Sequence, residues 1–130
     1  MKILLAEDDF VTRKFMSGFL SKYGECDVTV DGMEAVDAFM MALEDDEPYD
    51  LVCLDIMMPV MDGYQALMGI RNLEKERNIP KEQEAKVIMT TALNDEKNVK
   101  MAFDLGCTVY SGKPIDQDRF EQVLKKFGLI

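Results

Sequence analysis

Charged and polar side chains follow the short apolar segments of this sequence, at the point where each segment ends. They comprise four acids, two threonines and one lysine, namely Glu7, Asp8, Asp9, Asp55, Thr90, Thr91 and Lys113. Two like charges ~4 Å apart cost about 4 kcal/mol at an effective dielectric constant of about 20, so a pocket that holds several of these carboxylates needs a cation. Lys113 supplies one positive charge. Hard oxygen ligands without histidine or cysteine also favour Mg²⁺ as a bound ion.

A carboxylate, a divalent cation, a hydroxyl and an ammonium group together suit phosphoryl transfer, in which positioning and charge neutralisation provide most of the catalysis. Asp55 is the candidate nucleophile, because carboxylates can form aspartyl-phosphates. The sequence contains no histidine, so it lacks both the usual general base and the usual phosphorylated imidazole. Its three cysteines, Cys26, Cys53 and Cys107, form no C-x-x-C pair, which argues against a zinc site.

Short apolar runs alternate with longer segments of helical periodicity, a pattern typical of repeated β-α units around a parallel sheet. We expect five near-continuously apolar strands, as a sheet buried on both faces requires, at Lys2–Ala6, Asp27–Val30, Asp50–Leu54, Lys86–Thr90 and Thr108–Tyr110. The expected helices lie near residues 10–22, 33–43, 63–76, 95–105 and 116–127. The predicted fold is therefore an α/β fold with a doubly wound, five-stranded parallel sheet.

The order of the strands decides whether the polar side chains meet. In doubly wound sheets, ligands bind beyond the carboxyl ends of the strands. With the order 2-1-3-4-5, the first, third, fourth and fifth strands are successive neighbours ~4.8 Å apart. The acids after the first and third strands, the threonines after the fourth and Lys113 after the fifth would then converge on one pocket.

Length and charge restrict the class of protein further. We expect the 130 residues to form one domain, 1–130, without an output domain. The net charge of −10 and the sequence pI of about 4.4, without any basic stripe, disfavour nucleic acid as a direct partner. No apolar run reaches the roughly 18 residues that a membrane span needs. An odd number of cysteines in apolar surroundings suits a reducing compartment, so we expect a cytoplasmic protein.

Four motifs in register, "LLAEDD", "LDIMMPVMDG", "IMTTA" and "YSGKPI", give the chain a resemblance to the receiver domains of two-component response regulators, in particular the single-domain CheY-like kind. The resemblance covers essentially the whole chain and implies a flavodoxin/CheY-like fold. It implies that Asp55 accepts a phosphoryl group from a phosphohistidine on a sensor histidine kinase or phosphotransfer protein, in a Mg²⁺-dependent reaction. Such a protein is not an enzyme in the usual sense, because it promotes only its own phosphorylation and dephosphorylation.

The resemblance also implies how the metal is held. Asp9 and Asp55 would ligate Mg²⁺ directly, together with the backbone carbonyl of Met57. Asp8 would act through a bound water. The purely structural alternative for Asp8 and Asp9 is that one of them caps the N-terminus of the helix that starts near Phe10, but a cap needs one acid and not three.

A second set of residues would sense the phosphoryl group. The resemblance implies that Thr91 and Lys113 contact its oxygens and that Tyr110 changes rotamer as Thr91 moves inward. This switch would alter the surface formed by the fourth helix, the fifth strand and the fifth helix. An unidentified downstream protein, or a second copy in a phosphorylation-dependent dimer, would recognise that surface.

Two positions depart from the pattern of the family. The residues two places after the phosphorylated Asp and two places after the Thr often carry polar groups that orient an attacking water, and here they are Met57 and Leu93. Neither side chain can hydrogen-bond a water. We therefore expect slow autodephosphorylation and a long-lived phosphorylated state.

Three other functions fit parts of the sequence. A phosphorylation-independent docking module would not require the complete set of acids, Thr91 and Lys113. A Mg²⁺-dependent aspartyl-phosphate phosphatase of the haloacid-dehalogenase type also uses an Asp at a strand end, but it needs a second acid where Met57 stands. A flavin-binding flavodoxin-like module would need a hydroxyl-rich phosphate loop after the first strand, where this chain has three acids.

Overall fold

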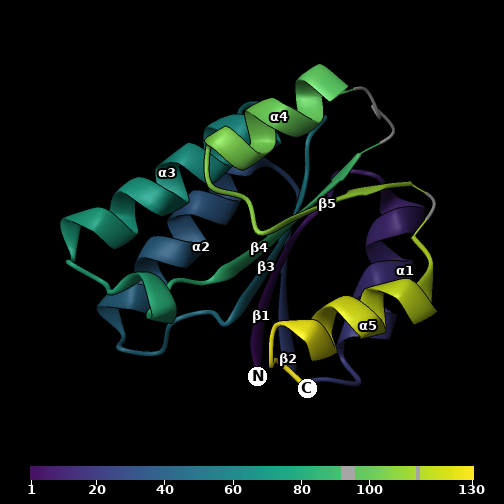
Figure 1. Ribbon diagram of the computed structural model, residues 1–130, viewed down its shortest axis with the longest axis horizontal. Helices are drawn as coiled ribbons and strands as arrows, with labels where there is room; N and C mark the ends of the chain where they lie inside the picture. The colour runs from purple at the N-terminus through teal and green to yellow at the C-terminus, as the bar shows by residue number, and fades with distance from the viewer. Residues whose placement is uncertain (92–95, 114) are drawn as a thin grey trace.

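The computed structural model describes residues 1–91, 96–113 and 115–130, and for residues 96–98 the backbone alone (Figure 1). The strands are β1 (Lys2–Ala6), β2 (Glu25–Thr29), β3 (Leu51–Asp55), β4 (Lys86–Thr91) and β5 (Val109–Gly112). The helices are α1 (Phe10–Leu20), α2 (Gly32–Glu44), α3 (Gly63–Glu76), α4 (Glu96–Asp104) and α5 (Gln117–Lys126), with a short 3₁₀ helix, η1 (Lys81–Gln83). The strands pair in parallel in the order β2-β1-β3-β4-β5, so the predicted fold class is confirmed.

The strand ends differ slightly from the prediction, and the differences affect the site. Asp55 is the last residue of β3 and pairs with Thr90, and Thr91 ends β4 and pairs with Gly112. The sequence prediction ended strands where apolar residues give way to polar ones. The ladder continues past that point because its hydrogen bonds join backbone groups, whatever the side chain. The short helix η1 lies between α3 and β4, in a stretch where the sequence analysis expected neither a helix nor a strand.

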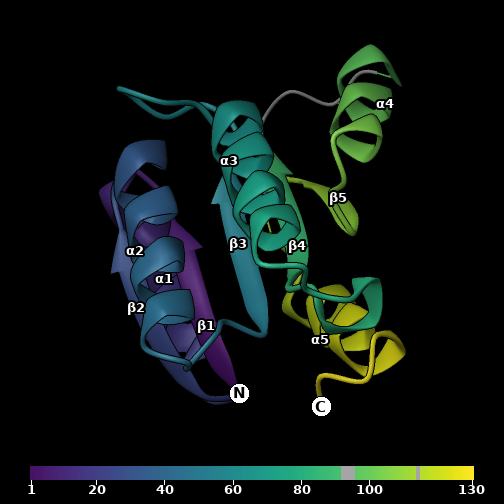
Figure 2. The same ribbon diagram turned by 90° about the vertical axis from the view of Figure 1, so that its left-hand side faces the viewer.

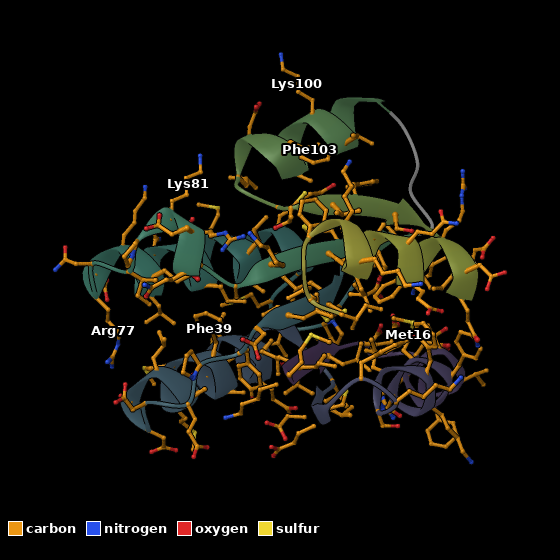
Figure 3. The ribbon with its side chains drawn as sticks, turned by 60° about the horizontal axis from the view of Figure 1, so that its bottom comes forward. Met16, Phe39, Arg77, Lys81, Lys100 and Phe103 are labelled. Atoms are coloured by element: carbon orange, nitrogen blue, oxygen red, sulfur yellow. The ribbon has the colours of Figure 1, made fainter. Side chains whose placement is uncertain are left out.

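Alternate residues of each strand supply two separate cores, one on each face of the sheet. On one face, Leu4, Val52 and Met89 pack with the buried sides of α2 and α3 and with Ala102 of α4. On the other face, Leu5, Cys53 and Ile88 pack with α1 and α5. Figure 1 shows these two layers of helices on opposite sides of the sheet. Figure 3 labels one buried side chain from each core, Phe39 and Met16.

Helix α4 lies at the edge of its layer. Figure 2 shows it beyond α3, above β5. Among its described side chains Ala102 is fully buried, whereas Met101 and Phe103 are about half exposed. Lys100 extends away from the molecule (Figure 3). No helix in the described ranges has both the length and the apolar character to cross a membrane.

Helices α1, α2, α3 and α5 each begin after an aspartate whose carboxylate accepts a backbone N–H of the first turn. These N-caps are Asp9, Asp31, Asp62 and Asp116. At α3 the cap is reciprocal, because the side chain of Gln65 also accepts the backbone N–H of Asp62. Each such cap is worth about 1 kcal/mol, and each sets the residue at which its helix starts.

A buried ion pair joins α3 to β4 and to the turn before β5. Arg71 Nη1 lies 2.7 Å from Glu74 Oε1 and donates to the carbonyl of Ala85, while its Nε donates to the carbonyl of Gly106. The other oxygen of Glu74 accepts the backbone N–H of Ala85 at 2.8 Å. The Glu74 side chain is only 2% exposed, so its charge depends on these donors.

Replacing Arg71 with Met tests this pair. The substitution keeps most of the apolar stem but leaves a buried carboxylate without its cation, so the free energy of unfolding should fall by about 3–5 kcal/mol in urea denaturation. Arg77, at the end of the same helix, is exposed and extends outward (Figure 3), so Arg77→Met should change it by less than about 0.5 kcal/mol. Equal losses in the two variants would contradict the assignment.

Candidate functional site

The candidate site lies at the carboxyl ends of four neighbouring strands. Asp55 ends β3, Thr91 ends β4, Glu7 follows β1 and Lys113 follows β5. Figure 1 shows that end of the sheet beside the start of α1. Asp55 is 4% exposed and Glu7 is 1% exposed, so two carboxylates are buried there side by side.

Three acids come together at this point. Glu7, Asp8 and Asp55 each offer a carboxylate oxygen, and these oxygens lie within 4.8 Å of one another. Asp8 is exposed, which leaves one side of the cluster open to solvent. Hard carboxylate oxygens at such a spacing suit a divalent cation such as Mg²⁺, which commonly keeps several waters and takes one or two protein carboxylates. The donor set therefore fits the ion that the sequence predicts.

Lys113 is the cation that contacts the buried acids. Its Nζ lies 3.0 Å from Glu7 Oε2 and 3.4 Å from Asp55 Oδ1. Its backbone N–H donates to the carbonyl of Thr91, which continues the β4–β5 pairing and holds the lysine next to the site. Burial alone would lower the pKa of Lys113, but the hydrogen bond and charge of Glu7, with those of Asp55, outweigh it and raise the pKa.

The environment of Asp55 disfavours its charged form. Burial, followed by the charge of Glu7, raises the pKa of Asp55 to about 7, although Lys113 acts in the opposite direction. A raised pKa follows when a buried carboxyl group shares a site with a like charge. One lysine thus compensates two buried acids only in part, and a further positive charge would favour the ionised carboxylate.

Asp9, which the sequence analysis expected to ligate the metal directly, is not one of the three clustered acids. Its Oδ2 accepts both the backbone N–H of Thr12 at 2.8 Å and the Thr12 hydroxyl at 2.7 Å, so it caps α1. These two hydrogen bonds lower the pKa of Asp9. In this structure Asp9 is the N-cap of α1, which is the alternative role that the sequence analysis gave it. Asp8, expected to act through a water, lies in the cluster itself.

Glu7 is a residue that the sequence analysis counted among the strand-end acids but to which it gave no role in holding the metal. Its backbone N–H donates to the carbonyl of Thr29, which extends the β1–β2 pairing by one residue. Its side chain accepts from Lys113 and from the backbone N–H of Asp9. Two signals could have found it: Glu7 is the first acid after the apolar run, and the Asp-x-x-Thr pattern marks Asp9 as a cap.

The predicted switch residues share one face of the sheet. Tyr110 pairs with Met89 in the register, and Thr91 lies two residues after Met89, so the alternation of side chains places both on the same face. Thr91 is fully buried, and Tyr110 packs partly buried against the core under α3. Thr90 pairs with Asp55. Because side chains alternate along a strand, Thr90 lies on the opposite face from its neighbour Thr91.

The loop after Asp55 is only partly open to solvent, because Ile56 and Met58 are buried whereas Met57 and Val60 are exposed. The side chain of Met57 is 63% exposed, which agrees with its position beside the cluster and outside the core. Val60, in the same loop, adopts φ of +68°, a conformation that a β-branched residue rarely takes. Leu93, the second departure from the family pattern, lies outside the described residues.

Comparison with known proteins gives consistent matches. The profile of the response regulator receiver domain matches residues 3–125. Hybrid signal transduction histidine kinase L of Dictyostelium discoideum is 31% identical over 128 residues, which make up 98% of this chain and 7% of that protein. Transcriptional regulatory protein CrdR of Helicobacter pylori is 32% identical over 97% of this chain and 54% of that protein. The chain thus spans at most about half the length of these two curated relatives.

Solved structures agree with this relationship. A chain in the crystal structure of the CheX–CheY–BeF₃–Mg²⁺ complex from Borrelia burgdorferi matches with a TM-score of 0.81 and 30% identity, over 98% of this chain and 89% of that one. The receiver domain of the histidine kinase CKI1 from Arabidopsis thaliana, crystallised with Mg²⁺, matches with a TM-score of 0.83 and 25% identity, over 96% and 90%. With its parallel sheet and its strand-end acids, this chain belongs to the family of response regulator receiver domains of two-component signalling.

Proposed function

We propose that the protein is a phosphoacceptor switch in which Asp55 takes a phosphoryl group from a phosphohistidine on a sensor histidine kinase or phosphotransfer protein. The observation that carries the proposal is the buried Asp55 carboxylate, 3.4 Å from Lys113 and clustered with two further acids. A carboxylate oxygen of Asp55 attacks phosphorus, and the bond from phosphorus to the imidazole nitrogen breaks with its electron pair left on the ring.

The residues around Asp55 have separate tasks in this proposal. Glu7, Asp8 and Asp55, with the backbone carbonyl of Met57, would hold Mg²⁺, and Asp9 would fix the loop through its cap. When bound, the ion supplies positive charge to the oxygens of the phosphoryl group. Lys113 would leave Glu7 to pair with one of those oxygens. The ion and Lys113 would each place a positive charge next to the negative charge that the reaction brings in.

A partner would recognise phosphorylation at a surface away from Asp55, to which Thr91 and Tyr110 would transmit the change. Thr91 would bond a phosphoryl oxygen, and Tyr110, on the same face, would repack as Thr91 moves. The affected surface comprises α4, β5 and α5, which a downstream protein or a second copy would recognise. That the protein acts in the cytoplasm stays a prediction from the sequence.

An apolar hollow beside the site suits the phosphodonor protein. It has a volume of about 520 Å³ and is lined by Val11, Thr12, Phe15, Lys113 and Ile115. Val11 is 73% exposed and Phe15 is 44% exposed. A donor must bring its phosphohistidine to Asp55, and because Lys113 belongs to both the hollow and the site, the two surfaces adjoin. We propose that a helix of the donor packs its apolar side here.

The first prediction concerns the acceptor. Incubation with Mg²⁺ and a small acyl-phosphate donor should add the mass of one phosphoryl group to the wild type and none to Asp55→Asn, as measured by intact-protein mass spectrometry. Asp37 is exposed and distant in the fold from the site, on α2, so Asp37→Asn should be modified as the wild type is. Modification of all three proteins would refute Asp55 as the acceptor, and modification of none would favour a phosphorylation-independent docking module.

The second prediction concerns the lifetime of the phosphorylated state. Met57→Asn adds an amide that can hydrogen-bond an attacking water, and a bond worth about 1 kcal/mol would speed loss of phosphate roughly fivefold. The rate can be followed by the decay of the phosphorylated mass after removal of the donor. Met68 is exposed on α3, so Met68→Asn should leave the rate unchanged. An unchanged or slower rate in Met57→Asn would show that Met57 does not protect the phosphoryl group.

The third prediction concerns the donor surface. Phe15→Asp should slow phosphorylation by a histidine phosphotransfer protein roughly tenfold, since it removes apolar contact worth about 1.5 kcal/mol or more, without slowing phosphorylation by the small donor. Phe103→Asp, an equally exposed position on α4, serves as control and should affect neither rate. If Phe15→Asp slowed both donors alike, the hollow would have no specific role in docking.

A further inference from the structure

Arg13, on the first turn of α1, contacts the backbone of the acidic cluster. Its Nη1 donates to the carbonyl of Glu7 at 3.1 Å and to the carbonyl of Asp8 at 3.2 Å. The guanidinium group lies over the ring of Phe10, 5.6 Å from its centroid. One side chain thus bonds the carbonyls of two consecutive residues, both of which belong to the acidic cluster.

The two acids differ in how their carboxylates are held. Glu7 is fixed directly, because its oxygens accept from Lys113 and from the backbone N–H of Asp9. The carboxylate of Asp8 accepts no hydrogen bond from the residues that the structure describes, and Asp8 is exposed. Its place in the cluster therefore follows from the path of its backbone, and Arg13 bonds the carbonyls of the two peptide groups on either side of the Asp8 Cα.

We propose that Arg13 is a positioning residue for the divalent cation: by holding the carbonyls of Glu7 and Asp8, it keeps the Asp8 carboxylate within reach of Asp55. The inference rests on the proposed cation site of the phosphoacceptor. It assigns Arg13 no contact with the ion or the phosphoryl group. Partners that orient a ligand without touching the metal commonly change affinity by a factor of ten or more when they are removed.

The sign of the effect separates this role from simple electrostatics. Arg13 is a cation close enough to the loop to contribute to the lowered pKa of Asp9. If its charge were all that mattered, removing it would relieve repulsion and tighten the binding of Mg²⁺. If positioning dominates, removing it lets the Asp8 backbone move and weakens binding. The two roles predict opposite changes in the dissociation constant.

The experiment measures Mg²⁺ binding by calorimetric titration, without any phosphodonor. Arg13→Met retains an apolar stem against Phe10 and should raise the dissociation constant roughly tenfold. Lys14→Met removes the same charge from the next position, which is exposed, and should leave the constant unchanged or slightly lower. Thermal unfolding in the presence of a chelator checks that both variants are folded.

A second variant covers the case in which Arg13→Met does not fold. Arg13→Lys keeps the charge and can bond one carbonyl, so its dissociation constant should lie between those of the wild type and Arg13→Met. Unchanged or tighter binding in Arg13→Met, or full wild-type affinity in Arg13→Lys, would overturn the inference and leave the phosphoacceptor proposal intact. A wild type that binds no Mg²⁺ would remove the cation site and this inference together, whereas one that binds Mg²⁺ but is never phosphorylated would refute only the phosphoacceptor.

Discussion

The structure depends on a charge imbalance at the carboxyl edge of the sheet. Glu7 and Asp55 are both buried, and Lys113 contacts both. The arrangement requires β1 to lie next to β3, so that Glu7 and Asp55 are neighbours. It also requires β5 to run parallel to them, so that Lys113, which follows β5, contacts both acids. The parallel order β2-β1-β3-β4-β5 provides both conditions. The fold matters for function because it forces together side chains that would repel one another in any looser arrangement.

A second buried acid shows what a purely structural ion pair looks like in the same molecule. Both oxygens of Glu74 have donors, Arg71 and the backbone N–H of Ala85, and the pair is neutral. At the carboxyl edge of the sheet, two buried acids and one exposed acid face one lysine. A buried charge is tolerated when it is paired, and a surplus of buried charge is a cost that stability alone does not explain. The contrast favours the carboxyl ends of the strands, and not the Arg71–Glu74 pair, as the site of the proposed phosphoryl transfer.

The sequence predicted the parallel sheet and the residues at the strand ends, because both follow from the alternation of apolar runs and helical segments. The alternation of apolar and helical segments predicts the sheet, and the predicted strands end one residue before Asp55, one before Thr91 and three before Lys113. The apolar runs alone do not distinguish Glu7 from Asp9, which only the capping pattern of Asp9 with Thr12 separates. Both acids follow β1, and which one enters the cluster depends on whether its backbone N–H joins the sheet, as in Glu7, or its carboxylate caps the helix, as in Asp9. Arg13 could not be found either, because it acts on carbonyls, which every residue has.

The same contacts suggest how a local charge would reach a distant surface. In the present arrangement Lys113 is nearer to Glu7 than to Asp55, and its backbone N–H bonds the carbonyl of Thr91. A phosphoryl group on Asp55 carries about two negative charges at neutral pH in place of the single charge of the carboxylate, and these charges would compete with Glu7 for the lysine. Any shift of Lys113 toward Asp55 acts through that backbone bond on the end of β4, where Thr91 shares a face with Tyr110. The face beyond them carries α4, whose described side chains contribute little to the core beyond Ala102. A helix whose described side chains are largely exposed is an element that a modest change in charge balance could displace, which is why we propose the readout there.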